Sequence, residues 1–412
     1  IIGSGFAGIG MAIQLKKAGI HSFTIFERAG EIGGTWRDNT YPGAACDVPS
    51  HAYSLSFEQN PGWTHRFSPS GEIQNYLLGL VAKWKLRSHL RLDTAMASAE
   101  FDEEQGAWTL TTDAGDTVVA RVVVSAVGGL VDPALPEIQG LQRFGGELFH
   151  TARWNHRYDL TGKRVGVIGT GASAVQVVPS IAPQVLRLAV FQRTPAWVVP
   201  KRDKRYSERA RRLYARFPFL LHASRFLQYL ASEIWGPMIF LDAPRLSALG
   251  ERLSMAHLHT QVKDPVLREK LTPHFQFGCK RILVTADYLP ALTRPNVDVV
   301  THGIREIREN AIVTADGVEH EVDTIIFGTG FHVLDLPFAD HVRGRGGVTL
   351  NESWKGSPSA YLGTTINGFP NLFFLMGPGT GLGHTSVIVM LEAQLQLLIG
   401  ALQHMQREKL DV

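Results

Sequence analysis

Short apolar runs alternate with longer helical patterns along the chain, and a glycine-rich loop joins the two kinds of pattern at two places. Residues 3–8 read Gly-Ser-Gly-Phe-Ala-Gly, and the spacing after them predicts a helix to Lys17 and then a strand at 23–26. The same order returns with a buried strand at 164–168 and the loop Gly-Thr-Gly-Ala-Ser-Ala directly after it. Two units of this kind predict two Rossmann-like nucleotide-binding domains.

The remaining pattern places one of these domains inside the other. Strand patterns at 108–112 and 122–124 read as a meander that closes the first unit. The run at 323–331 closes the second unit and returns the chain to the first. Residues from about 203 to 272 lack strand patterns and indicate a helical insertion in the second unit. The sequence therefore predicts an α/β fold with a first domain at 1–140 and 326–412, a linker at 141–155, and a second domain at 156–325.

Composition narrows the class of protein without deciding it. The 412 residues are 44% hydrophobic and 19% charged, with a formal net charge of +3, as is ordinary for a soluble protein of two or three domains. So small a charge gives no reason to expect nucleic acid or an anionic membrane as a partner. The longest apolar stretch, at 217–241, is interrupted by polar and charged residues, so no membrane-spanning segment is predicted. We interpret the charged run at 201–205 as a solvated face.

The chain has two cysteines, Cys46 and Cys279, without the spacing of a redox pair or a zinc motif. This excludes a disulfide reductase, gives no metal site, and favours a reducing cytoplasm. Both cysteines adjoin candidate site residues, and we interpret both as packing residues.

The two ends of the chain are unusual for this fold. Only Ile1 and Ile2 precede the first loop, where a buried strand of about five residues is typical. The last residues follow a long helical pattern as though another strand were starting. We expect the natural polypeptide to extend past both ends.

The residue after the second strand of each unit indicates which nucleotide binds there. A glycine loop at a helix start directs backbone N–H groups and the positive end of the helix dipole at a pyrophosphate. Glu27 holds this place in the first unit, and a carboxylate suits ribose hydroxyls and repels a phosphate. Arg193 holds it in the second unit, either as a partner for a 2′-phosphate or as a surface charge. We therefore predict FAD on the first loop and NADPH on the second.

A third motif lies between the two units. Residues 144–155 read Phe-Gly-Gly-Glu-Leu-Phe-His-Thr-Ala-Arg-Trp-Asn, which fits the pattern F-x-G-x-x-x-H-x-x-x-W. This run resembles the fingerprint of Baeyer–Villiger monooxygenases, flavoenzymes that insert one oxygen atom of O2 beside a ketone carbonyl. Asn155 departs from the family, which usually has Pro or Asp after the tryptophan. The resemblance implies FAD and NADPH as cofactors, a ketone and O2 as substrates, and an ester or lactone as the product.

The resemblance covers nearly the whole chain and implies roles for individual residues. Arg281 would stabilise a peroxide formed at flavin C4a and its adduct with the ketone, and Asp47 would be the buried carboxylate that orients it. The residues expected at FAD are Gly3, Gly5, Gly8, Glu27, Gly34, Thr35, Trp36, Asp47, Tyr53, Gly377 and Pro378. The residues expected at NADP are Gly169, Gly171, Ala172, Ser173, Ala174, Arg193, Thr194 and Lys280. For the fingerprint, a role in domain closure and simple packing of a linker are both open; its residues are Phe144, Gly146, His150 and Trp154.

Three other functions remain open on the sequence. An N- or S-oxygenating flavin monooxygenase shares both glycine loops but does not need a cation such as Arg281. An NADPH oxidase would bind both cofactors and release hydrogen peroxide. A flavoprotein with a binding or sensing role would have no turnover, and the presence of Asp47 and Arg281 argues against it.

Overall fold

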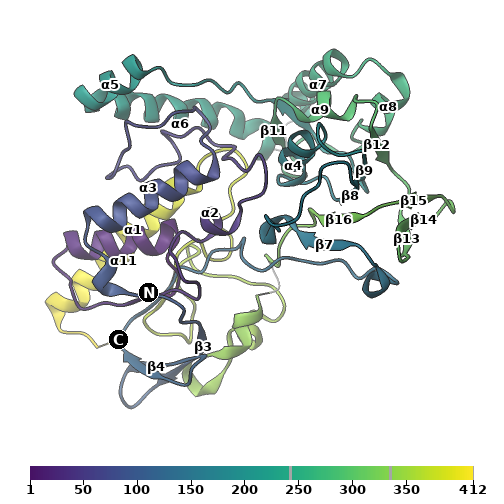
Figure 1. Cartoon of the computed structure of the whole chain (residues 1–412). Helices are drawn as coiled ribbons and strands as arrows, with labels where there is room; N and C mark the ends of the chain where they lie inside the picture. The colour runs from purple at the N-terminus through teal and green to yellow at the C-terminus, as the bar shows by residue number, and fades with distance from the viewer. Residues whose placement is uncertain (241–243, 334–335, 412) are drawn as a thin grey trace.

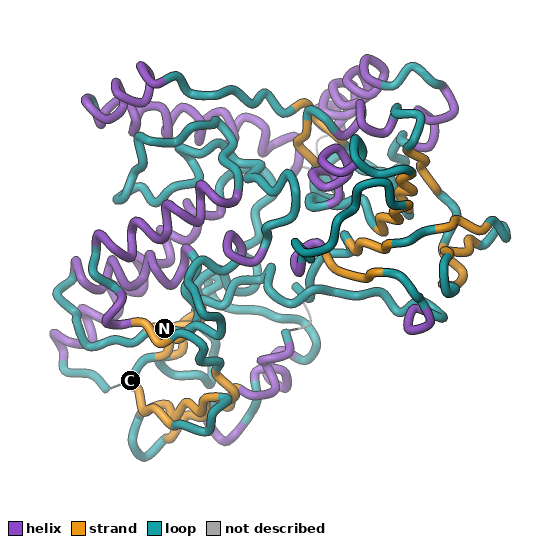
Figure 2. The backbone as a smooth tube through the Cα atoms, viewed as in Figure 1, coloured by secondary structure: helices purple, strands orange, loops and turns teal. Residues whose placement is uncertain are grey.

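The computed structural model describes residues 1–240, 244–333 and 336–411 and arranges them around two parallel sheets (Figures 1 and 2). Each glycine loop follows a strand position inside one of these sheets, because Ile2 and Ile168 are paired on both sides with neighbouring strands. Both loops therefore lie at carboxyl edges of parallel strands, where nucleotides bind in folds of this class.

The sheet of the first unit runs in the order β2, β1, Ile2, β6, β18, with Ile2 bridging Phe26 and Ser125 in place of a central strand. Three helices gather beside it (Figure 1), and α11 packs against α1 in the apolar core. By length and composition α11 is also apolar enough to cross a membrane, which many core helices are. The elements are β1 (Ile25–Phe26), β2 (Leu90–Arg91), β6 (Val123–Ser125), β18 (Leu372–Phe374), α1 (Phe6–Lys17), α3 (Ser70–Lys83) and α11 (Val387–Glu408).

A smaller sheet completes the first unit. It runs in the order β17, β3, β4, β5, and the three strands β3 to β5 are antiparallel. The predicted meander is therefore right for 108–112 but wrong for 122–124, because β6 leaves it and pairs in parallel with β18. The elements are β3 (Met96–Asp102), β4 (Ala107–Thr112), β5 (Thr117–Ala120), β17 (Val342–Arg343) and α10 (Leu350–Trp354).

The second unit holds a five-stranded parallel sheet in the order β12, β9, β8, β16, β7. Its inner strands are rich in β-branched residues, and Val165, Val167 and Ile326 are buried, as strands covered on both faces require. The segment 147–150, expected in the linker, is instead the edge strand β7, paired with β16. The elements are β7 (Glu147–His150), β8 (Arg164–Ile168), β9 (Arg187–Phe191), β12 (Val297–Val300), β16 (Thr324–Phe327), α4 (Ala174–Ile181) and α9 (Tyr288–Leu292). A small antiparallel sheet, which the sequence reading missed, connects β12 to β16: β13 (Ile304–Ile307), β14 (Ala311–Thr314) and β15 (Glu319–Glu321).

The predicted helical insertion is confirmed, and it contacts both units (Figure 1). Its first part lies on the first unit, where the Arg66 amide donates to the Lys204 carbonyl and the Tyr206 amide to the Thr64 carbonyl. Its third helix packs on the second unit, where the Ser254 hydroxyl donates to the Val198 carbonyl on β10. Its helices are α5 (Glu208–Arg216), α6 (Pro218–Phe240), α7 (Pro244–Gln261) and α8 (Pro265–Lys270), and the strands that flank it, β10 (Val198–Pro200) and β11 (Leu283–Thr285), pair in parallel.

Two chain segments cross between the units, and they pair with each other. Pro133 forms a bridge with Phe331, and the Ala134 amide donates to the Gly330 carbonyl at 2.9 Å. The His332 amide donates to the Asp132 carbonyl at 3.0 Å. The connection between the two nucleotide units is thus a paired double strand rather than a single linker.

Candidate functional site

The glycines of the first loop do two different things. A Cβ on Gly3 would lie 2.5 Å from the Ala126 carbonyl oxygen, and one on Gly8 would lie 2.0 Å from that of Gly3, so both positions require glycine for packing. A Cβ on Gly5 would meet only the Cα of Gly34, at 3.9 Å. Gly5 and Gly34 therefore lie directly against each other, and because neither carries a side chain, a pyrophosphate can approach the backbone beside them. These residues fit the dinucleotide that the sequence predicted.

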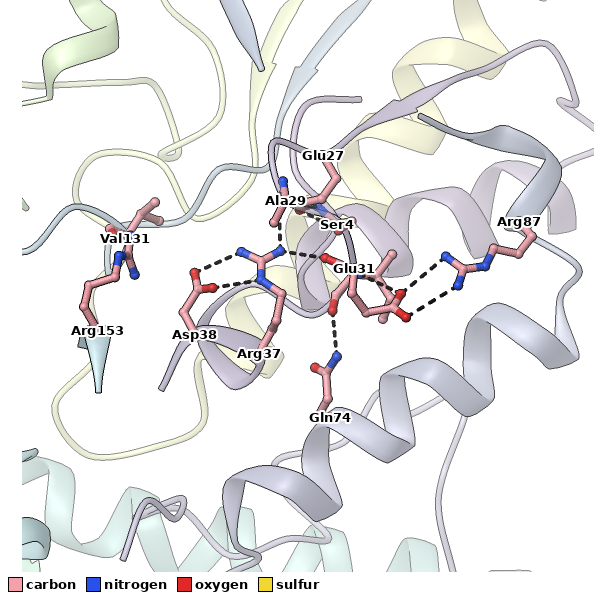
Figure 3. Close-up of polar contacts among 11 residues, drawn as sticks. Ser4, Glu27, Ala29, Glu31, Arg37, Asp38, Gln74, Arg87, Val131 and Arg153 are labelled. Atoms are coloured by element: carbon pink, nitrogen blue, oxygen red, sulfur yellow. Dashed lines mark hydrogen bonds and ion pairs between the residues drawn. The ribbon is translucent and has the colours of Figure 1, made fainter. Parts of the chain in front are cut away.

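Glu27 lies at the carboxyl end of β1 and points at this loop (Figure 3). It is buried, and its Oε2 accepts from the Ser4 amide at 3.1 Å and from the Ser4 hydroxyl at 2.5 Å. Its Oε1 accepts from the Ala29 amide at 3.1 Å. Contacts within the protein therefore fix the Glu27 carboxylate, which was expected at the ribose, beside the glycine loop.

Arg37 also reaches Glu27, and sequence reasoning did not single it out. It belongs to the short helix α2 (Thr35–Asp38), directly after Gly34, and its Nη1 lies 2.8 Å from Glu27 Oε1. The signal that was available is its position in the sequence, directly after Gly34, Thr35 and Trp36, which were expected at FAD. Arg37 follows Glu27 by ten positions, and this spacing alone does not indicate an ion pair. The pair forms because the segment between the two residues folds back on itself.

Two aromatic residues of the predicted FAD set lie together. The Trp36 Nε1 donates to the Tyr53 hydroxyl at 3.2 Å, and the Tyr53 ring packs edge-on against Phe6 at 5.2 Å. Burial raises the pKa of Tyr53, so this residue stays a neutral phenol. Thr35 begins α2 beside Trp36. Gly377 and Pro378 follow β18, at the carboxyl edge of the same sheet as the first loop.

The second loop repeats the first in outline. Gly169 has φ +110° and a Cβ there would lie 2.4 Å from the Gly328 carbonyl oxygen, whereas Gly171 has open space around it. The loop continues through Ala172 and Ser173, and Ala174 begins α4. Arg193 follows β9 and is exposed, and the Thr194 carbonyl accepts from the Thr170 hydroxyl at 3.3 Å. Lys280 is exposed as well, with its ammonium 5.0 Å from the Phe275 ring centroid, and no contact joins it to Arg193 within the described ranges.

Arg281 and Asp47 meet across the two units, although 234 positions separate them in the chain. The Arg281 Nη2 donates to Asp47 Oδ2 at 2.6 Å, and the Asp47 carboxylate raises the pKa of Arg281. The side chain of Arg281 is 53% exposed and that of Asp47 is 22% exposed. The predicted pair is therefore formed, but Asp47 is half-buried rather than buried, because it lies at the open side of the contact between the units.

The cysteines beside this pair differ. Cys46 is buried, and burial raises the pKa of its thiol, so it remains protonated and unreactive. Cys279 is exposed, so the packing interpretation is right for Cys46 and wrong for Cys279.

The loop that carries Asp47 is held by two further residues of the second unit, which sequence reasoning missed. Gln176 on α4 accepts from the Tyr41 hydroxyl at 3.0 Å and donates to the Ala45 carbonyl at 2.9 Å. The Lys201 ammonium donates to the Cys46 carbonyl at 3.2 Å. The prediction that the run at 201–205 is a solvated face is therefore wrong for Lys201. Gln176 could have been noticed as a polar residue in the otherwise apolar stretch of α4.

The fingerprint residues mostly make packing contacts with neighbouring strands and with a crossing segment. A Cβ on Gly146 would lie 2.3 Å from the Asp323 carbonyl oxygen and 2.7 Å from the Phe144 ring, which explains the Phe-x-Gly part. His150 is buried at the end of β7, and burial, followed by the charge of Arg153, lowers its pKa to about 4. Its ring packs edge-on against Phe331, on the crossing segment, at 5.7 Å.

Two more contacts tie this motif to its surroundings. Trp154 packs edge-on against Phe149 at 4.9 Å. Arg153 donates to the Val131 carbonyl on the other crossing segment at 3.4 Å (Figure 3). The motif therefore joins the sheet of the second unit to both crossings, and its role in domain closure stays a prediction.

Known flavoenzymes match the chain along its length. The family described as "Pyridine nucleotide-disulphide oxidoreductase" matches residues 1–213. A Baeyer–Villiger monooxygenase of Streptomyces coelicolor is 49% identical over 405 residues, which are 98% of this chain and 78% of that protein. Another Baeyer–Villiger monooxygenase, of Pseudomonas aeruginosa, is 48% identical over 412 residues, which are 100% of this chain and 78% of the relative.

Solved structures match the chain as well, at lower sequence identity. Cyclohexanone monooxygenase from Rhodococcus sp. Phi1, bound to NADP+, has a TM-score of 0.88 at 31% identity, over 98% of this chain and 84% of that one. The OTEMO complex with FAD and NADP has a TM-score of 0.88 at 30% identity, over 99% of this chain and 85% of that one. The predicted α/β fold with two Rossmann-like domains is confirmed by these matches.

Proposed function

The chain belongs to the family of Baeyer–Villiger monooxygenases, and from this premise we propose that it uses FAD, NADPH and O2 to convert a ketone into an ester or lactone. FAD lies on the first loop, against the backbone at Gly5 and Gly34, with Glu27 at its ribose. NADPH lies on the second loop, with Arg193 and Thr194 at the 2′-phosphate. When bound, the flavin would be the group that reacts with O2, and NADPH would be the source of its electrons.

The contact between Arg281 and Asp47 carries this proposal. A ketone oxygenation builds negative charge on the reacting oxygen, and a fixed cation lowers the free energy of that state when water is excluded. Arginine remains charged under such conditions, and its planar group offers five N–H donors. Among the described residues, Asp47 is the one polar partner of the Arg281 side chain, so donors are left for the reacting atoms.

The loop contacts from the second unit support the same reading. Gln176 and Lys201 hold the residues just before Asp47, so Asp47 is positioned by the unit that binds NADPH. Binding of the coenzyme to the second unit can therefore influence where the Asp47–Arg281 pair lies relative to the flavin. His150 and Trp154, which connect that unit to the crossing segments, take part in domain closure rather than in a chemical step.

The test is the coupling between NADPH oxidation, O2 consumption and ester formation over a panel of cyclic and open-chain ketones. With an accepted ketone we expect one ester or lactone for each NADPH and each O2 consumed, and no effect of catalase. If catalase instead returned half of the consumed oxygen with every ketone, the protein would be an NADPH oxidase. Oxygenated amines or sulfides without any ester would indicate an N- or S-oxygenating enzyme.

The cytoplasmic location also stays a prediction.

A further inference from the structure

Glu27 is a buried carboxylate at the first glycine loop. Its side chain is 6% exposed, and three N–H or O–H groups of Ser4 and Ala29 donate to its two oxygens. None of these neutral groups offsets its charge. A buried carboxylate without a cation is costly and tends to take up a proton.

Arg37 supplies that cation in a fixed position (Figure 3). Its Nη1 lies 2.8 Å from Glu27 Oε1 and donates to the Glu31 carbonyl at 2.8 Å. Its Nε and Nη2 donate to the two carboxylate oxygens of Asp38 at 2.8 and 2.9 Å. The guanidinium is 17% exposed and is thus held on three sides, with one edge directed at Glu27.

The neighbourhood of Glu27 makes this charge matter for binding. Ser4 is a member of the glycine loop, and it donates to Glu27 through both its amide and its hydroxyl. A diphosphate on that loop would bring further negative charge close to a carboxylate that is already buried. Like charges at short range in a site of low polarity repel strongly, unless a cation lies beside one of them.

We propose that Arg37 is a positioning residue of the first nucleotide site, which offsets the charge of Glu27 and keeps its carboxylate directed at the ribose while a diphosphate occupies the adjacent loop. The proposal rests on the proposed function, because that function places FAD at this loop. It makes a specific claim: Arg37 contributes to FAD affinity through the charge of Glu27 and not through the stability of α2. The contribution of Arg37 must therefore vanish when Glu27 carries no charge.

A double-mutant cycle tests this claim. The full chain, stripped of flavin, is titrated with FAD, and binding is followed by flavin fluorescence for the parent, Arg37→Gln, Glu27→Gln and the double variant. We expect Arg37→Gln to raise the Kd for FAD by about 10- to 100-fold, the range of hydrogen bonds to charged groups. In the Glu27→Gln background the same change should raise the Kd by less than about threefold, since an amide needs no compensating charge.

Two further variants separate this role from a structural one. Arg37→Lys keeps the positive charge and should recover most of the affinity. Arg87 is the matched control, because it is an arginine paired with a carboxylate of the same loop, Glu31, at 3.3 Å, but it is 59% exposed and forms no ion pair or hydrogen bond with Glu27, both of which the structure describes (Figure 3). Arg87→Gln should leave FAD binding within about twofold of the parent, as for most exposed pairs.

The possible failures are distinguishable. If the parent bound FAD tightly and Arg37→Gln bound it equally well, the role of Arg37 would be refuted while the proposed function stood. Equal losses in the parent and Glu27→Gln backgrounds, or no recovery with Arg37→Lys, would show that Arg37 acts only through local structure. If the flavin-free parent bound no FAD at all, the assignment of FAD to the first loop would itself be wrong.

Discussion

Arg225 and Arg281 both belong to the part of the chain inserted in the first unit, and both reach a carboxylate of that unit, but their surroundings differ. Arg225, on α6, is 12% exposed, with its Nη2 at 3.2 Å from Glu392 on α11. Its Nη1 donates to the carbonyls of His51, Ala52 and Ser54. Arg281 is largely exposed and bonds to Asp47 alone among the described residues.

This difference fits a structural role for Arg225 and the role that the proposed function gives to Arg281. The donors of Arg225 are shared among four partners, so it has little capacity left for a ligand and instead fixes the insertion to the first unit. The donors of Arg281 are mostly free to act on something that the protein does not itself contain. We therefore expect Arg225 to act through stability, whereas the role of Arg281 towards a substrate rests on the proposed function, with which its uncommitted donors are compatible.

The largest effect on stability is expected at Arg225. Arg225→Met would leave Glu392 buried without its cation and three carbonyls without a donor. Breaking a buried pair in this way costs about 3–5 kcal/mol in the free energy of unfolding, measurable by urea denaturation. The double variant Arg225→Met/Glu392→Leu should recover part of the loss, since no charge is then left unpaired. A loss below about 1 kcal/mol for the single variant would show that the pair is only a surface contact.

The largest effect on chemistry is expected at Arg281. Hydride transfer from NADPH to the flavin needs correct stacking and distance, but oxygen insertion needs a cation at the developing negative charge. Arg281→Ala should therefore keep FAD binding and flavin reduction and lower ester formation by about 100- to 1000-fold. Stopped-flow absorbance follows reduction, and chromatography follows the ester. Its free energy of unfolding should change by less than about 1 kcal/mol, in contrast to Arg225→Met.

A near-parental rate of ketone oxygenation by Arg281→Ala would break the comparison. Arg281 would then be an ordinary exposed arginine, and an N- or S-oxygenating enzyme would be the better reading. Arg281→Lys serves as the control for charge. Lysine restores a cation but not the planar fork, so we expect partial recovery only.

The sequence predicted what local patterns determine and missed what the tertiary fold brings together. Both glycine loops, the strands β8 and β9, and the helical insertion follow from periodicity and composition, which act over about ten residues. The pairing of Arg281 with Asp47 was expected from family resemblance, and spacing alone does not give it. Arg37 and Arg225 were missed because their partners depend on how a loop and a helix fold back.

Two errors of detail have the same origin. The edge strand β7 was taken as linker because an edge strand needs only one partner and carries a weak apolar pattern. Val123 and its neighbours were placed in a meander, because short apolar strands do not reveal whether their partner is parallel or antiparallel.

Arg193 extends the comparison to an arginine with no internal partner. It is exposed after β9, and no ion pair involves it in the part of the chain that the structure describes. Its contribution should then concern the ligand alone. We expect NADPH to be preferred over NADH by about 1–3 kcal/mol, and Arg193→Ala to raise the KM for NADPH while that for NADH stays almost unchanged. Equal use of both coenzymes by the parent would contradict this assignment.

The smallest effect is expected at Asp47, and it decides what holds Arg281 in place. Asp47→Ala removes the orienting carboxylate but leaves the cation itself. Because Gln176 and Lys201 still hold the neighbouring loop, Arg281 should sample more positions without leaving the site. We expect ester formation to fall by about 10-fold, the effect of one lost hydrogen bond to a charged group, with flavin reduction little changed. Asp47→Asn keeps an acceptor at the same place and should lose less than Asp47→Ala if geometry matters more than charge. If Asp47→Ala were as inactive as Arg281→Ala, Asp47 would act on the reacting atoms directly, and the pair would be one catalytic unit rather than a cation and its support.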